Sequence, residues 1–146
     1  MALGPPRIFI DTGALVAYFR EKEQWHSEVK TAYKNYQQLG VSFLTTNYVL
    51  GELFTWASRI VTVVEVRRLV EGIQLAVELG ELRVLYADAE IDRRAREILV
   101  KFFEHRVSFP DAVTYLVCKD FKIDEVFTLD EDFRKMGLVT APNIRG

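Results

Sequence analysis

Four carboxylic acids stand at points in the chain where solvation alone explains them poorly: Asp11, Glu52, Asp111 and Asp130. Asp11 and Asp130 each follow a short apolar run, and Asp111 begins an apolar helical stretch. Two carboxylates about 4 Å apart repel by roughly 4 kcal/mol at an effective dielectric constant of 20, so a cluster needs a bound cation or protonation. Because ligands that are all oxygen favour Mg²⁺ or Mn²⁺ over Zn²⁺, the four acids predict a magnesium or manganese site.

Three of these acids also have a simpler explanation. Asp11 precedes a predicted helix and can cap it, and Asp130 can cap the short helix that follows it. Asp111 falls in the first turn of a helix capped by Ser108, where the helix dipole favours a carboxylate. Taken one at a time, these three acids do not require a metal site.

Glu52 has the least ordinary context. In a helix that begins at Asn47, its neighbours one turn away include Tyr48 and Trp56, so its charge interrupts an apolar stripe. The alternative is a Glu at the margin of that stripe, paired with Arg59. Helical spacing alone leaves both interpretations open.

The two histidines and the single cysteine do not add to this constellation. His26 and His105 lack ligand spacing with each other or with Cys118. We expect the histidines at the surface or satisfied in the core, and the cysteine as a small buried residue.

Strand-like and helical segments alternate along the chain. Strands are expected at residues 7–10, 41–45, 82–85 and 125–127, with a fifth at 138–139, because β-branched and aromatic residues dominate these short runs. Helices are expected at 12–19, 25–39, 47–60, 62–79, 88–104 and 108–121. Asn47 and Thr62 are the expected N-caps of the helices at 47–60 and 62–79. This alternation predicts an α/β fold with a mostly parallel sheet between helices. Ligands of such sheets bind beyond the carboxyl ends of the strands, the edge to which Asp11 and Asp130 belong.

Size and charge narrow the class of protein. The 146 residues are 49% hydrophobic, enough for one core, and we expect a single domain over residues 1–146. The formal charge of −2 gives no overall positive field, so any contact with nucleic acid must be local. No apolar run reaches the ~20 residues of a bilayer span, and the first residues do not have the pattern of a signal peptide. We expect a cytoplasmic protein without a membrane segment.

Four short motifs follow in order: Ile8-Phe9-Ile10-Asp11-Thr12, Leu50-Gly51-Glu52-Leu53, Val107-Ser108-Phe109-Pro110-Asp111-Ala112 and Val126-Phe127-Thr128-Leu129-Asp130-Glu131-Asp132-Phe133. In this order and spacing the chain resembles PIN domains, in particular the VapC-type toxins of toxin–antitoxin pairs. The resemblance covers nearly the whole chain. It implies an α/β/α sandwich with a central, mostly parallel sheet, and an endoribonuclease that depends on Mg²⁺ or Mn²⁺.

The resemblance also implies roles for individual residues. Asp11, Glu52, Asp111 and Asp130 match the acidic quartet of the family and are the expected catalytic and metal-binding residues. Asp132 could be a fifth acid of the metal site, could hold a metal-bound water, or could face solvent at the start of a short helix. Thr128 matches a small polar residue beside the last acid. Thr12 is expected to orient Asp11 or a water, or to cap a helix. The expected partners are the RNA substrate, a second copy in a homodimer, and a small antitoxin protein.

Two other functions remain open at this point. One is a catalytically silent PIN-like domain that serves as a binding or scaffold unit in RNA processing. The other is a phosphatase or receiver-like domain that uses Asp11 as a nucleophile, although a receiver would carry a Lys after a late strand where this chain has Thr128 and Asp130. Incubation with RNA and with phosphomonoesters, with and without Mg²⁺, separates the three.

Overall fold

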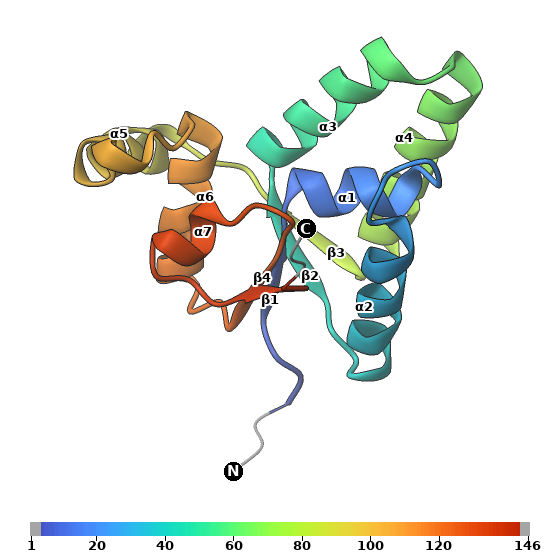
Figure 1. Ribbon diagram of the computed structural model, residues 1–146, viewed down its shortest axis with the longest axis horizontal. Helices are drawn as coiled ribbons and strands as arrows, with labels where there is room; N and C mark the ends of the chain where they lie inside the picture. Colours follow the sequence, from blue (N-terminus) through green and yellow to red (C-terminus); the bar gives the residue numbers. More distant parts are fainter. Residues whose placement is uncertain (1–3, 144–146) are drawn as a thin grey trace.

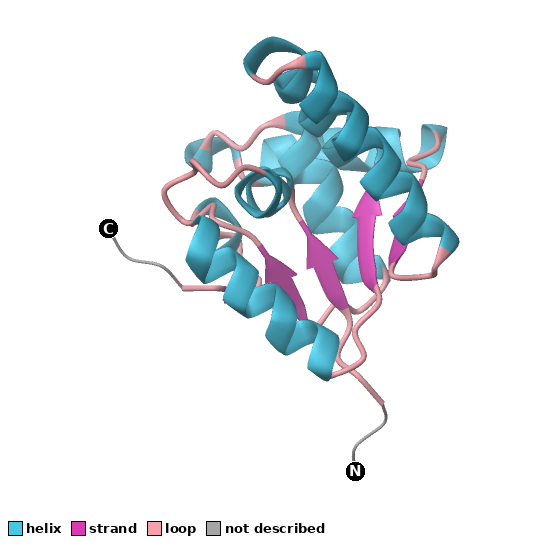
Figure 2. Ribbon diagram, turned by 90° about the vertical axis from the view of Figure 1, so that its right-hand side faces the viewer, coloured by secondary structure: helices cyan, strands magenta, loops and turns pink. Residues whose placement is uncertain are grey.

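A five-stranded parallel sheet lies at the centre of the computed structural model, which describes residues 4–143. The strands are β1 (Ile8–Ile10), β2 (Phe43–Thr46), β3 (Leu82–Leu85), β4 (Glu125–Phe127) and β5 (Thr140–Ala141). Their order is β3-β2-β1-β4-β5, every neighbouring pair is parallel, and β1 occupies the middle (Figures 1 and 2). The predicted parallel sheet is confirmed, and its carboxyl ends lie at one edge.

Helices cover both faces of this sheet, so the molecule is the predicted α/β/α sandwich (Figure 1). α1, α2 and α4 lie on one side, and α6 lies on the other with α5 packed against it. The helices are α1 (Thr12–Phe19), α2 (His26–Gln38), α3 (Asn47–Ile60), α4 (Val63–Glu78), α5 (Ala89–Lys101), the 3₁₀ turn η1 (Phe103–His105), α6 (Phe109–Asp120) and α7 (Asp132–Lys135).

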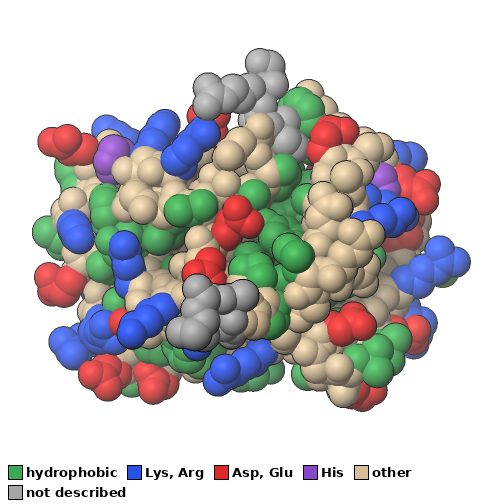
Figure 3. Space-filling model, turned by 90° about the horizontal axis from the view of Figure 1, so that it is seen from below, with side chains coloured by type: hydrophobic (Ala, Val, Ile, Leu, Met, Phe, Trp, Pro, Cys, Tyr) green, Lys and Arg blue, Asp and Glu red, His purple; other side chains and the backbone are tan. Residues whose placement is uncertain are grey.

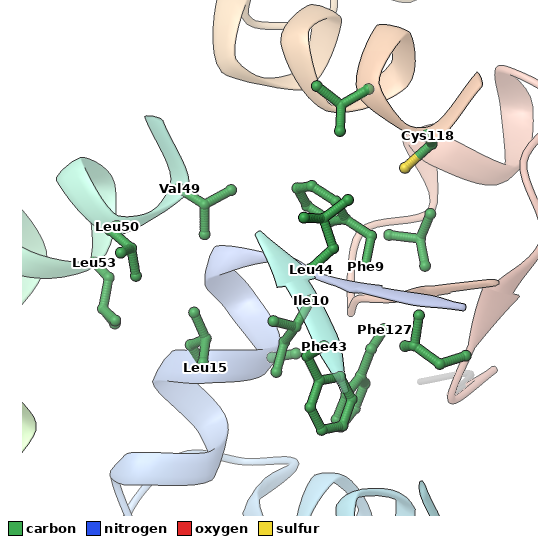
Figure 4. Packing of buried hydrophobic residues seen from close by; sticks show 14 of the residues in the cluster. Phe9, Ile10, Leu15, Phe43, Leu44, Val49, Leu50, Leu53, Cys118 and Phe127 are labelled. Atoms are coloured by element: carbon green, nitrogen blue, oxygen red, sulfur yellow. The ribbon is translucent and has the colours of Figure 1, made fainter. Parts of the chain in front are cut away.

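The alternation of side chains along the strands divides the core between the two faces. Phe9 points toward Cys118 on α6, whereas Phe43 and Phe127 lie together on the side of α1 and α2 (Figure 4). Tyr36 of α2 contacts both of these rings, with centroid distances of 5.6 and 5.0 Å. Phe9 of β1 and Phe127 of β4 are fully buried. Because full burial of each such side chain is worth roughly 1.5–3 kcal/mol, these residues help to hold the two strands in place.

Several element boundaries differ from those predicted. Thr46, not Asn47, caps α3, because its hydroxyl accepts the N–H of Val49 at 3.2 Å. Asn47 instead accepts the N–H of Ala87 at 2.8 Å, which ties α3 to the chain after β3. The last strand pairs at Thr140–Ala141, two residues later than predicted. The fifth helix ends at Lys101 and is followed by the separate turn η1, three residues earlier than predicted.

α3 and α4 form a hairpin that projects beyond the sheet (Figure 1). Leu69 and Ile73 of α4 enter the core, but six large apolar residues of the hairpin remain exposed: Ile60, Val63, Val64, Val70, Leu75 and Val77. By contrast, the face shown in Figure 3 carries positive and negative side chains interspersed around an apolar middle. Within residues 4–143, no helix has the length and apolar character needed to cross a bilayer.

Candidate active site

The four predicted acids line one hollow at the carboxyl edge of the sheet. This acidic hollow encloses about 460 Å³ and is lined by Asp11, Thr12, Gly13, Glu52, Ser108, Asp111, Leu129 and Asp130. Residues from α1, α3, α6 and the loop after β4 therefore meet, although they lie far apart in the sequence. This is the position in which an open parallel sheet binds its ligands.

Asp11 is the most enclosed of the acids. It occupies the N-cap position of α1 without a side-chain cap bond, and it is only 7% exposed. Its Oδ2 accepts a hydrogen bond from the hydroxyl of Thr128 at 3.0 Å. Burial raises the pKa of Asp11 to about 7, with repulsion from Asp111 and Glu52 adding to the rise, although hydrogen bonds from Thr12 and Thr128 oppose it. A metal-free Asp11 is thus partly protonated at neutral pH.

The hydroxyl of Thr128 links Asp11 to Asp130. It accepts the backbone N–H of Asp130 at 3.0 Å while it donates to Asp11. Oδ1 of Asp130 in turn accepts the backbone N–H of Asp132 at 2.9 Å. Each of the two acids therefore keeps one carboxylate oxygen outside these bonds.

Asp111 is held at the start of α6 by the predicted cap. The hydroxyl of Ser108 accepts the backbone N–H of Asp111 at 3.2 Å, and Pro110 fits the first turn, where no N–H donor is required. Partial burial, followed by repulsion from Asp130, raises the pKa of Asp111 to about 6. Asp111 therefore lies in a helix N-terminus and also faces the other acids.

Glu52 is exposed, in contrast to Asp11. Its Oε1 accepts a hydrogen bond from the hydroxyl of Thr12 at 3.0 Å, so the side chain of Thr12 orients Glu52, and only the backbone of Thr12 acts on Asp11. The alternative pairing with Arg59 does not occur among residues 4–143. Its neighbours Tyr48 and Trp56 are half-buried.

Asp132 lies beside this hollow rather than in its lining. Carboxylate oxygens of Asp111, Asp130 and Asp132 lie within 4.8 Å of one another. The carboxylate of Asp132 is also 3.8 Å from the Nζ of Lys135, one turn along α7. Asp132 is therefore close enough to join a cation held by the other two, or to hold a water bound to it.

The donor set of the hollow fits a hard divalent cation. Its charged groups are all carboxylates, and the two described histidines and Cys118 are not among the lining residues. Burial and mutual repulsion raise the pKa of both Asp11 and Asp111, so a proton or a cation at these groups is favoured over an unpaired negative charge.

Comparisons with known proteins agree with this geometry. A family model described as the PIN domain matches residues 8–138. The "23S rRNA-specific endonuclease VapC20" of Mycobacterium tuberculosis (strain ATCC 25618 / H37Rv) is 27% identical over 133 residues, which cover 90% of this chain and 95% of that protein. A "VapC ribonuclease" of Archaeoglobus fulgidus is 26% identical over 116 residues, 78% of this chain and 71% of that protein.

Solved structures show the same architecture. The crystal structure of Mycobacterium tuberculosis VapC20, described as a sarcin–ricin loop cleaving toxin, has a TM-score of 0.78 and 26% identity, with 90% of this chain and 96% of that chain covered. A chain of the VapBC2 complex from Rickettsia felis, bound to promoter DNA, has a TM-score of 0.62 at 13% identity, covering 91% and 96% of the two chains. The second likeness supports the fold alone.

Proposed function

Because this chain belongs to the PIN-domain family, we propose that it is a divalent-metal-dependent endoribonuclease and the toxin of a toxin–antitoxin pair. We further propose that residues 1–146 act as one nuclease domain. The observation that carries the proposal is the meeting of Asp11, Glu52, Asp111 and Asp130 around one hollow. A pure binding module has no need of four carboxylates whose repulsion costs stability.

Under this proposal Asp11, Glu52, Asp111 and Asp130 hold Mg²⁺ or Mn²⁺, with Asp132 beside them. When bound, such a cation makes a water easier to deprotonate and stabilises the negative charge that develops on a phosphodiester. The chain's own contribution is placement of the acids. Thr128 fixes Asp11 and the backbone of Asp130, and Thr12 fixes Glu52.

The raised pKa values add a pH dependence to this site. Asp11 and Asp111 must lose their protons before they can bind a cation, and burial raises the pKa of these groups to about 7 and about 6. Metal binding therefore releases protons and should weaken as the pH falls below 7. Activity at low metal concentration should fall over the same range.

The direct test is incubation of the purified protein with RNA and with a phosphomonoester, in Mg²⁺, Mn²⁺ or EDTA. We expect cleavage of RNA only with metal and no release of phosphate from the monoester. RNA binding without cleavage would favour the silent scaffold, and phosphate release would favour the phosphatase. Ribosomal RNA is the first substrate to try, since the similar VapC20 protein is described as specific for 23S rRNA.

The proposed partners are a small antitoxin and a second copy of the chain. The exposed apolar residues of the α3–α4 hairpin, among them Ile60, Val63 and Val64, support the presence of a protein partner. Sedimentation of the protein alone and with the product of the neighbouring reading frame would test both associations.

A further inference from the structure

A second hollow lies beside the acidic one and shares Glu52 with it. It encloses about 570 Å³, and its other walls include Tyr48, Trp56, Arg59, Ile60 and Pro110. Residues 56 and 59 follow residue 52 by about one and about two helical turns, so the three share one face of α3. Arg59 lies about 10 Å along the helix axis from Glu52, given a rise of 1.5 Å per residue. An extended single strand covers that distance within a few nucleotides.

Arg59 is available to bind an anion. Among residues 4–143 it has neither an ion pair nor a side-chain hydrogen bond, whereas Arg20, Arg94, Arg96 and Arg134 all pair with carboxylates. The guanidinium group suits phosphate, which it can bind through two parallel N–H donors. A polyanion that approaches the four acids receives no help from the overall charge of −2, so a local cation at this position matters.

Trp56 supplies the second kind of contact. Its side chain is half-buried in the wall of the hollow, between Glu52 and Arg59 along the helix. The face of an indole ring can stack on any nucleobase. Tyr48 is less free, because its hydroxyl donates to Asp92 at 3.0 Å and its ring packs edge-on against Phe109.

We propose that this second hollow, the Trp56–Arg59 subsite, binds a nucleotide that flanks the scissile bond, with its base on Trp56 and a phosphate on Arg59. The inference rests on the proposed ribonuclease function. Since a base must leave its own stack to lie on Trp56, the RNA is single-stranded or looped out at this point. The subsite contacts the face of a base and a phosphate but not the edges of the base, so it tolerates any sequence.

The test compares Arg59→Gln with Arg67→Gln, which removes an exposed charge from α4, outside both hollows. Cleavage of a labelled oligoribonucleotide is followed with enzyme in excess, over a range of enzyme concentrations. Arg59→Gln should raise the half-saturating concentration about tenfold, since a charged contact is lost, and leave the maximal rate within about twofold. The slope of log affinity against log salt concentration should also become shallower by about 0.7, the value for one phosphate of a single strand. Arg67→Gln should change neither.

The stacking contact is tested by placing an abasic nucleotide at each position near the cleaved bond. At one position, the abasic nucleotide should raise the half-saturating concentration of the wild type about tenfold. The same substrate should raise that of Trp56→Ala little further. Trp56→Phe keeps a ring and should recover much of the loss, which separates stacking from a folding defect. Effects that are additive at every position would overturn the proposal, as would equal behaviour of Arg59→Gln and Arg67→Gln.

Two further results keep this inference separate from the nuclease proposal. If the wild type cleaves no RNA, fluorescence anisotropy of the labelled RNA in EDTA measures RNA binding and tests the subsite without cleavage. If Arg59→Gln then binds RNA more weakly than the wild type and Arg67→Gln does not, the subsite is supported and the nuclease proposal is refuted. If the three proteins bind equally, or none binds, the subsite is refuted. If Arg59→Gln changes the sedimenting mass instead of RNA affinity, the hollow is an interface between copies and the proposal is wrong.

Discussion

Asp11→Asn should stabilise the metal-free protein at neutral pH while it removes nuclease activity. Burial, with repulsion from Asp111 and Glu52, raises the pKa of Asp11 from 3.8 to about 7. A tenfold change in a proton equilibrium is worth about 1.4 kcal/mol, so this difference corresponds to about 4 kcal/mol. Relaxation of the neighbouring acids reduces that value, and we expect about 2–4 kcal/mol.

The sign follows from proton linkage. The folded protein binds this proton more tightly than the unfolded chain does, so the contribution of Asp11 to the free energy of unfolding is greatest below pH 3.8. It declines as the pH rises and is fully lost above about pH 7. Asn does not titrate. The free energy of unfolding of the variant minus that of the parent should therefore increase by about 2–4 kcal/mol between pH 4 and pH 8.

Urea unfolding in EDTA at a series of pH values measures this difference. Glu71→Gln, which removes an exposed carboxylate from α4, is the control and should run parallel to the parent. Added Mn²⁺ should restore the advantage of the parent, by about 2.7 kcal/mol when the metal is at 100 times its Kd. A pH-independent difference, or a variant that is less stable than its parent at pH 8 in EDTA, would refute the reasoning and favour a helix-capping role.

Three further substitutions test other members of the site. Glu52→Gln should stay folded, because Glu52 is exposed, yet lose more than about tenfold in cleavage and bind Mn²⁺ more weakly in calorimetry; unchanged values in both would remove Glu52 from the site. Thr128→Val leaves the N–H of Asp130 and the carboxylate of Asp11 without their shared partner, so it should cost about 1–3 kcal/mol of stability in thermal unfolding, and Thr128→Ser should not. Asp132→Asn should weaken Mn²⁺ binding less than Glu52→Gln does, since Asp132 is not in the lining of the hollow; the reverse order would make it a direct ligand.

The order of the helices and strands could be predicted because its signals are local. Thr62 and Ser108 cap helices as expected, each through a bond to a backbone N–H three residues ahead. The error at α3 has the same origin, since Thr46 and Asn47 can both cap and only the distant N–H of Ala87 decides between them. The last strand lies two residues later than predicted for a similar reason. A strand of two residues has no periodicity, so its position depends on its pairing with β4.

The candidate site could be predicted only in part. The acids were visible as charges at strand ends, at a helix start and within an apolar stripe, and the parallel sheet brings them to one edge. The bonds that orient them could not be predicted. Thr12 reaches Glu52 across 40 residues and Thr128 reaches Asp11 across 117, and no local pattern records such contacts.

These bonds also hold the acids in two different ways. Asp11, Asp111 and Asp130 are fixed by the ends of β1, α6 and β4, and Thr128 joins the first and last of them, so loss of that hydroxyl disturbs two acids together. Glu52 is exposed and, within residues 4–143, its carboxylate is hydrogen-bonded by Thr12 alone, on a helix that continues through Trp56 and Arg59 into the α3–α4 hairpin. Because Glu52, Trp56 and Arg59 lie on one continuous helix, a change in the position of α3 would move all three together. α3 packs against both α1 and α6, so the contacts of this helix connect Glu52 to the elements that carry Thr12 and Asp111.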